Sequence, residues 1–158
     1  HEDIEKWQHT FTGIQFNDEK HNFLIYGGVD DIMIDEEDKL VVVDFKATAK
    51  KADILTTSDV YNNGESYKRQ LEIYSWLLQK NNFDVSTTGY LMYYNGDASK
   101  PHLGREMYFR RTLVPFNLDT SWIDPMVDDI YECLQKKEIP KSNENCEECI
   151  YLKTVSTL

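Results

Sequence analysis

Residues 27–47 read GGVDDIMIDEEDKLVVVDFKA, and this stretch decides the fold that the sequence predicts. The segments 27–34 and 40–47 are both rich in β-branched and apolar residues, a composition that favours β-strands. The polar segment 35–39 between them has the length of a hairpin connection. We therefore expect two adjacent antiparallel strands. The second is apolar on both faces, as in a central strand packed on both sides.

Charged side chains occur near the end of this second strand. Because side chains alternate along a strand, Asp44 and Lys46 point to one face and Phe45 points to the other. A buried carboxylate needs compensation, and Lys46 is one candidate. If the hairpin brings Asp30 beside Asp44, we expect the two carboxylates to hold a divalent cation, for which Mg²⁺ or Mn²⁺ is suitable. The alternative is a structural ion pair at a strand end, with Asp30 in a turn.

Residues 65–80 give the clearest helical pattern in the chain. Gln70, Tyr74, Leu77 and Leu78 recur at helical spacing and therefore share one face. Most such stripes belong to the core, but Gln70 is a neutral amide one turn away from a tyrosine hydroxyl. The amide therefore either caps the edge of a sheet or lines a functional site.

Three short motifs follow one another along the chain, namely Gly28-x-Asp30, Asp44-x-Lys46 and Gln70-x-x-x-Tyr74. Their order resembles the PD-(D/E)xK nuclease superfamily, and within it the RecB-like branch that includes the CRISPR-associated adaptation exonucleases. The resemblance covers residues 1–151, nearly the whole chain. It implies an α/β fold in which helices flank a central mixed β-sheet, the restriction-endonuclease-like core. Each motif alone is short, but three in this order and spacing are specific.

The resemblance also implies a role for the motif residues on the two strands. Asp30, Asp44 and Lys46 would be the catalytic residues. A Mg²⁺ or Mn²⁺ ion would be held by the two aspartates and the backbone carbonyl of Phe45, and Lys46 would orient or help to deprotonate the nucleophilic water.

Two further positions take their roles from the resemblance. The helical pair, Gln70 and Tyr74, lines the active site in this family and helps to position nucleic acid. A histidine followed by glutamate, on a helix before the first motif strand, supplies a metal ligand, and His1 stands at the matching place. Residues 1–7 have helical character, but His1 is alternatively a tag remnant or a frayed end. The ligand role implies a helical segment that lies upstream or was lost.

Length and charge set further bounds. A chain of 158 residues is enough for one domain, and we expect a single nuclease domain over residues 1–158. The 17 basic and 28 acidic residues give a formal charge of −11, which argues against a protein that coats nucleic acid electrostatically. A local basic groove is compatible with this value, because net charge averages over different faces. No apolar run approaches the ~20 residues of a membrane span, so we expect no membrane partner.

The three cysteines, Cys133, Cys146 and Cys149, indicate a reducing compartment, and we expect a cytoplasmic protein. Cys146 and Cys149 form a C-x-x-C pair, the usual half of a metal site. Many RecB-like nucleases hold a four-cysteine iron–sulfur cluster here. In this sequence no cysteine follows Cys149 and none lies near the start, and Cys133 is expected to be a buried thiol of a helix over residues 121–137. We therefore expect no iron–sulfur cluster in the recorded chain.

Further strands are expected at residues 11–16, 23–26, 87–94 and 106–115. The connection 47–64 carries Lys50 and Lys51, and it is either a mobile flap near the site or a solvated surface loop. Four basic residues gather later in the chain as a phosphate-contacting patch or as a solvated face, namely Lys100, Arg105, Arg110 and Arg111.

From these features we expect a metal-dependent DNA nuclease that hydrolyses phosphodiester bonds, specifically an exonuclease acting on single-stranded DNA or on DNA ends. The alternative is a catalytically weak or inactive nuclease-fold module that serves as a subunit of a DNA-processing complex. The joint presence of Asp30, Asp44 and Lys46 favours the enzyme. The charge of −11 favours an acidic surface that docks a basic protein partner.

Overall fold

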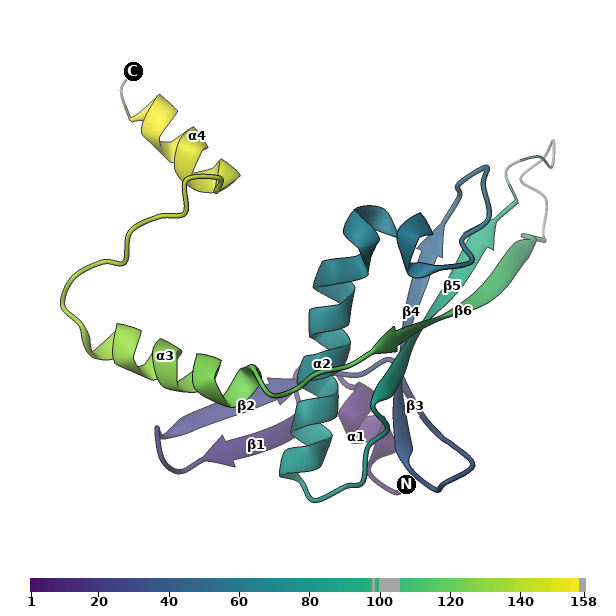
Figure 1. Ribbon diagram of the computed structural model, residues 1–158, viewed down its shortest axis with the longest axis horizontal. Helices are drawn as coiled ribbons and strands as arrows, with labels where there is room; N and C mark the ends of the chain where they lie inside the picture. The colour runs from purple at the N-terminus through teal and green to yellow at the C-terminus, as the bar shows by residue number, and fades with distance from the viewer. Residues whose placement is uncertain (98, 100–105, 157–158) are drawn as a thin grey trace. The chain divides into compact units, whose positions relative to one another are not determined.

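The computed structural model describes residues 1–97, 99 and 106–156. They form two compact units, His1–Ile123 and Asp124–Leu158. The elements of the first unit are shown in Figure 1 and comprise the short helix α1 (Ile4–Gln8), the strands β1 (Ile14–Asp18), β2 (Phe23–Gly27), β3 (Asp31–Ile34), β4 (Leu40–Thr48), β5 (Thr88–Gly96) and β6 (Phe109–Asn117), the 3₁₀ turns η1 (Thr57–Asp59) and η2 (Tyr61–Gly64), and the long helix α2 (Glu65–Lys80).

Four strands form the main sheet, in the order β3-β4-β5-β6. The pair β4 and β5 is parallel, whereas β3 with β4 and β5 with β6 are antiparallel. The predicted hairpin is confirmed, with Asp31 opposite Val43 and Ile34 opposite Leu40. Because β4 and β5 run in the same direction, α2 crosses between them, as parallel strands require. The predicted fold class, a central mixed sheet flanked by helices in a restriction-endonuclease-like core, is therefore confirmed.

Helix α2 has the predicted bounds, and it contacts β4 and β5 as well as β1 and β2. Its residues Leu71, Leu77 and Leu78 are fully buried, which explains the apolar stripe in the sequence. Its close approach to the small β1–β2 sheet depends on a glycine. A Cβ atom at Gly27 would lie 2.7 Å from the ring of Tyr74, so any larger residue would displace this tyrosine.

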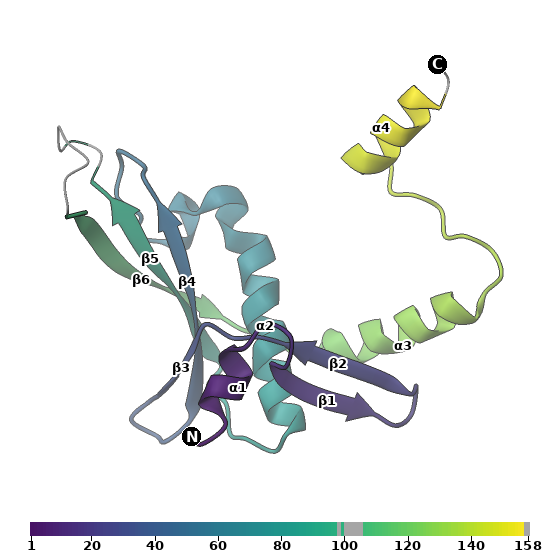
Figure 2. The ribbon, with the colours of Figure 1, turned by 180° about the vertical axis from the view of Figure 1, so that it is seen from behind.

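The start of the chain differs from the prediction in two places. The expected strand 11–16 begins only at Ile14, because the N–H groups of Thr12 and Gly13 donate to His9 O and form a turn (3.2 and 2.8 Å). The strand expected from residue 27 begins only at Asp31. Before it, the N–H of Val29 donates to the carbonyl of Trp7 (3.0 Å), which holds α1 beside this segment (Figure 2).

The second unit contains α4 (Glu147–Val155) and nearly all of α3 (Ile123–Gln135), which confirms the helix expected over residues 121–137. A buried thiol was expected at Cys133, but this residue is only half-buried. In α3 the one buried residue is Ile123, so most of the helix is not packed into a core. Cys146 precedes α4 as its N-cap and accepts the N–H of Cys149 (3.4 Å). Among the described residues, no helix is long and apolar enough to span a bilayer.

Glu72 on α2 holds the segment that follows β6 through hydrogen bonds. Its side chain is 4% exposed, and its two oxygens accept the N–H of Asp119 (3.0 Å) and the indole N–H of Trp122 (2.9 Å). Lys68, one helical turn away, lies 3.4 Å from the same carboxylate. One buried carboxylate therefore satisfies a backbone donor and a side-chain donor of the same segment.

We predict that Glu72→Ala lowers the free energy of unfolding by about 3 kcal/mol, because it removes two hydrogen bonds to a charged, buried acceptor. The loss corresponds to a fall in Tm of roughly 6–12 °C in a thermal unfolding experiment. Glu65→Ala is the control, since Glu65 is exposed on the first turn of the same helix and should change stability by less than about 1 kcal/mol. An equal loss of stability in the two variants would contradict the role given to the hydrogen bonds of Glu72.

Candidate active site

Strand β4 carries two charged side chains on one face near its C-terminal end. The side chain of Asp44 is buried, with 2% of its surface exposed, and that of Lys46 is 21% exposed. The Lys46 ammonium forms an ion pair with Asp44 Oδ2. The alternation expected from the sequence is therefore correct, and the buried carboxylate is compensated first by its neighbour on the same face.

Asp30 lies directly before β3, opposite Asp44 if the register of the hairpin is continued by one pair. Its Oδ2 accepts the backbone N–H of Phe45 (2.7 Å), so this exposed carboxylate continues the hydrogen bonding of β3 to β4 where the strand itself stops. The Gln8 amide donates to the carbonyl of Asp30 (2.8 Å) and fixes its backbone from α1. The hairpin thus brings the two aspartates together, as the sequence predicts.

Helix α2 contributes the next contacts. The Lys46 ammonium donates to Gln70 Oε1 (3.4 Å), and the Gln70 amide donates to the hydroxyl of Tyr74 (2.9 Å). The ring of Tyr67 lies under the same ammonium, 4.7 Å from its centroid. A continuous polar chain therefore leads from Asp44 on the sheet to Tyr74 on the helix, with a cation–π contact at its centre.

The electrostatics of this group are dominated by burial. Burial raises the pKa of Asp44 above its ordinary value of 3.8, and the nearby charge of Asp30 raises it further, whereas Lys46 opposes the shift. Burial also raises the pKa of Tyr93, with smaller contributions from Tyr67 and Asp44. The strand position of Asp44 therefore carries an ionisation cost that a second cation would relieve.

The residues present fit a divalent metal ion. Asp44 Oδ2 is buried and, within the described part of the chain, has no hydrogen-bond partner of normal geometry, only the ion pair with Lys46. The exposed carboxylate of Asp30 and the buried one of Asp44 are hard oxygen donors that leave room for waters, as Mg²⁺ prefers. The N–H of Phe45 donates to Asp30. In a strand the N–H and C=O of one residue point to the same side, so the carbonyl of Phe45 also points toward Asp30.

The structure does not bring His1 to this group. Its ring stacks on Trp7 with a centroid distance of 4.6 Å and meets Phe83 edge-on at 5.5 Å. Its Nδ1 accepts the N–H of Asp3 (3.1 Å). Among residues 1–97, 99 and 106–156 no three His, Cys, Asp or Glu side chains form a group suited to a metal. In this structure the ring of His1 is engaged by aromatic neighbours, and its role as a metal ligand stays a prediction.

Three contributors were not identified from the sequence, namely Gln8, Tyr67 and Tyr93. Tyr67 lies three residues before Gln70 and so on a neighbouring part of the same helical surface, a spacing that could have identified it. Tyr93 pairs with Lys46 across β4 and β5, a relation that needs the strand register. Gln8 has no local signal, since its partner lies 22 residues away.

Comparison with known proteins adds the family. The sequence model of the PD-(D/E)XK nuclease superfamily matches residues 1–154. No curated protein and no solved structure is significantly similar to the chain. The match covers almost the whole length, including the two strands and the helix that hold the carboxylates, the lysine and the Gln-Tyr pair. The chain therefore belongs to the PD-(D/E)XK nuclease superfamily.

Proposed function

We propose that this nuclease-superfamily member is a divalent-metal-dependent deoxyribonuclease, an exonuclease of the RecB-like branch that acts on single-stranded DNA or on DNA ends. The observation that carries the proposal is the convergence of Asp30, Asp44 and Lys46 at the C-terminal end of β4, with Gln70 in contact with the lysine. A structural ion pair alone would not require a second carboxylate, from Asp30 directly before β3, on the same side.

The proposed chemistry uses each of these groups. Held by Asp30, Asp44 and the carbonyl of Phe45, a Mg²⁺ or Mn²⁺ ion would lower the pKa of a bound water and polarise the phosphate. Lys46 places an ammonium where it offsets the negative charge of the reacting phosphodiester. Its head group is held on one side by Gln70, and its position is therefore fixed before the substrate arrives.

The aromatic side chains complete the proposed site. The ring of Tyr67 shields one side of the Lys46 ammonium from water, which strengthens the electrostatic interactions of that ammonium. Tyr74 accepts a hydrogen bond from Gln70 and so orients the amide that contacts the lysine. In this proposal Gln70 and Tyr74 also line the path of the nucleic acid.

A second candidate function is a catalytically weak module within a DNA-processing complex. Two observations favour it, the net charge of −11 and the lack, among the described residues, of a third metal-binding side chain beside the two aspartates. A partner that supplies basic surface would then be needed for cleavage. The three free cysteines of the chain support a cytoplasmic location for either function.

We predict that Lys46→Ala lowers cleavage of DNA by about 10²–10³-fold, because it removes a charge aimed at the reacting phosphate. Cleavage is measured with Mn²⁺ or Mg²⁺ on single- and double-stranded oligonucleotides labelled at either end, with EDTA as the metal-free reference. The matched control is Lys39→Ala, since Lys39 lies at the other end of β4 and pairs with Glu37.

Each outcome of this assay has a defined meaning. Full cleavage by Lys46→Ala would show that the active site lies elsewhere. Cleavage that appears only when a partner protein is added would favour the second candidate function. Internal cuts in a circular single strand would contradict exonuclease action, since a circle offers no end.

A further prediction concerns pH and metal binding. A carboxylate must lose its proton before it binds a metal, so the raised pKa of Asp44 should make Mn²⁺ affinity fall already above pH 3.8 as the solution is acidified. In the metal-free protein the sign is the opposite. The raised folded-state pKa favours the protonated form, so this contribution to stability is largest below pH 3.8 and is lost as pH rises through the folded-state pKa.

Asp44→Asn tests both parts of this prediction at pH 7. The variant should bind Mn²⁺ more weakly by calorimetry, and without metal its Tm should rise by about 2–4 °C for each kcal/mol of ionisation cost that is relieved. The matched variant Asp31→Asn lies one residue after Asp30 and should change neither quantity greatly. A metal-free Asp44→Asn protein that is less stable than the wild type would contradict the assigned cost.

A further inference from the structure

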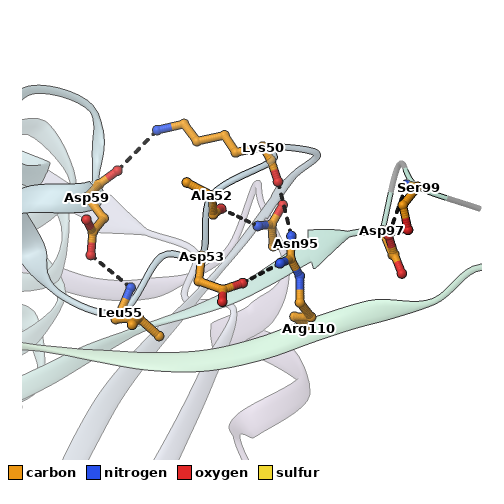
Figure 3. Close-up of polar contacts among 9 residues, drawn as sticks. All are labelled: Lys50, Ala52, Asp53, Leu55, Asp59, Asn95, Asp97, Ser99 and Arg110. Carbon is orange, nitrogen blue, oxygen red and sulfur yellow. Dashed lines mark hydrogen bonds and ion pairs between the residues drawn. The ribbon is translucent and has the colours of Figure 1, made fainter.

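A pocket opens beyond the end of β4, next to the proposed active site. Its volume is about 440 Å³, within the range of ligand sites in proteins, and among the described residues its lining includes Lys50, Lys51, Asp97, Ser99 and Arg110. The first two belong to the segment that leaves β4, the next two follow β5, and Arg110 lies on β6 (Figure 3). Three different parts of the chain therefore contribute to it.

The wall of the pocket is held in place by hydrogen bonds. Arg110 donates to the carbonyl of Lys50 (3.2 Å) and pairs with Asp53 (2.5 Å), while the buried Asn95 donates to the carbonyl of Ala52 (2.9 Å; Figure 3). The Lys50 ammonium donates to the carbonyl of Asp59 (3.1 Å). The start of the connection, expected as a mobile flap or a solvated loop, is thus anchored to the sheet.

The pocket gathers positive charge in an acidic protein. Lys50, Lys51 and Arg110 line it, and Asp97 is its one acidic member among the described residues. The Asp97 carboxylate already accepts the N–H and the hydroxyl of Ser99 (3.0 and 2.6 Å). In the described part of the chain no side chain pairs with the Lys51 ammonium, so it is available to an anion. Arg110 retains donors beyond the two that it uses.

The strand register places this pocket on the same face as the proposed catalytic residues. Thr48 follows Lys46 on that face, Asn95 pairs with Thr48, and Arg110 pairs with Asn95. Arg110 is thus two strands and one two-residue step away from Lys46. With strands about 4.8 Å apart and a rise of about 3.3 Å per residue, the two Cα atoms are separated by roughly 12 Å.

The four basic residues that were predicted as a patch do not all lie on the face of this pocket. Lys100 and Arg105 lie outside the described residues. Arg110 points to the catalytic face, whereas Arg111 pairs with Tyr94 and points to the opposite face. Of the two described arginines of this predicted patch, Arg110 is therefore the one placed to act on a strand bound at the active site, together with Lys50 and Lys51.

We propose that the pocket of Lys50, Lys51 and Arg110 binds the sugar-phosphate backbone of the substrate strand. This inference rests on the proposed nuclease function. A separation of roughly 12 Å between the two Cα atoms is short on the scale of a bound strand, so the pocket holds a phosphate within a few nucleotides of the bond that is cut. Contacts to phosphate carry no sequence information, and the subsite therefore anchors and orients any strand.

The test is DNA binding in EDTA, measured separately from cleavage. A fluorescein-labelled 12-nucleotide single strand is titrated with the full chain, and anisotropy gives the Kd at several salt concentrations. We expect Lys51→Glu to raise the Kd on the order of fivefold, and Lys51→Ala to reduce the slope of log K against log salt by about 0.7. Lys39→Glu makes the same change in net charge at the other end of β4 and should alter the Kd less than twofold.

The outcomes separate the subsite from the proposed function. Wild-type binding and salt slope in both Lys51 variants would overturn the subsite, even if the wild type cleaves DNA. An equal loss in Lys39→Glu would also overturn it, since the effect would then reflect net charge alone. Cleavage that persists in Lys46→Ala, with the expected loss of binding in Lys51→Glu, would overturn the assigned active site and leave the subsite. A wild type that neither binds nor cleaves DNA would overturn both.

Discussion

The buried carboxylate of Asp44 is the constraint on which the site depends. A charge on a central strand is unfavourable unless other groups compensate it, and burial raises the pKa of this carboxyl accordingly. Lys46 supplies the first compensation from the same face of β4. The pair costs stability relative to apolar residues, as buried ion pairs often do, so its presence on a central strand favours a functional role over a purely structural one.

The surrounding elements hold this pair in a defined position. Asp30 caps the edge of β4 through the N–H of Phe45, and Gln8 holds Asp30 from α1. On the other side, α2 brings Gln70 to the lysine, and α2 itself approaches closely because Gly27 leaves space for Tyr74. Each supporting contact joins segments that are far apart in the sequence. The geometry of the site is thus a property of the whole first unit.

Whether a contact is local or joins distant segments decides whether the sequence could predict it. The hairpin, α2 and the opposition of Asp30 and Asp44 follow from local patterns, since strand alternation, hairpin length and helical periodicity act over a few residues. The contacts of Gln8 and the surroundings of His1 depend on tertiary packing, which a single sequence does not encode in any short motif. The strand before Ile14 was placed too early because a turn around His9 overrides the apolar character of Phe11.

The parallel pairing of β4 and β5 also determines which charged groups lie together at one edge of the sheet. Parallel strands end at the same edge of a sheet, so the catalytic residues of β4, Asn95 of β5 and the anchored segment with Lys50 and Lys51 gather at one edge. The chain as a whole carries a net charge of −11, which disfavours contact with a phosphate backbone at long range. Under the proposed function a DNA strand would meet attraction along the line from Lys46 to the basic pocket, and such a local basic surface is compatible with a net charge of −11.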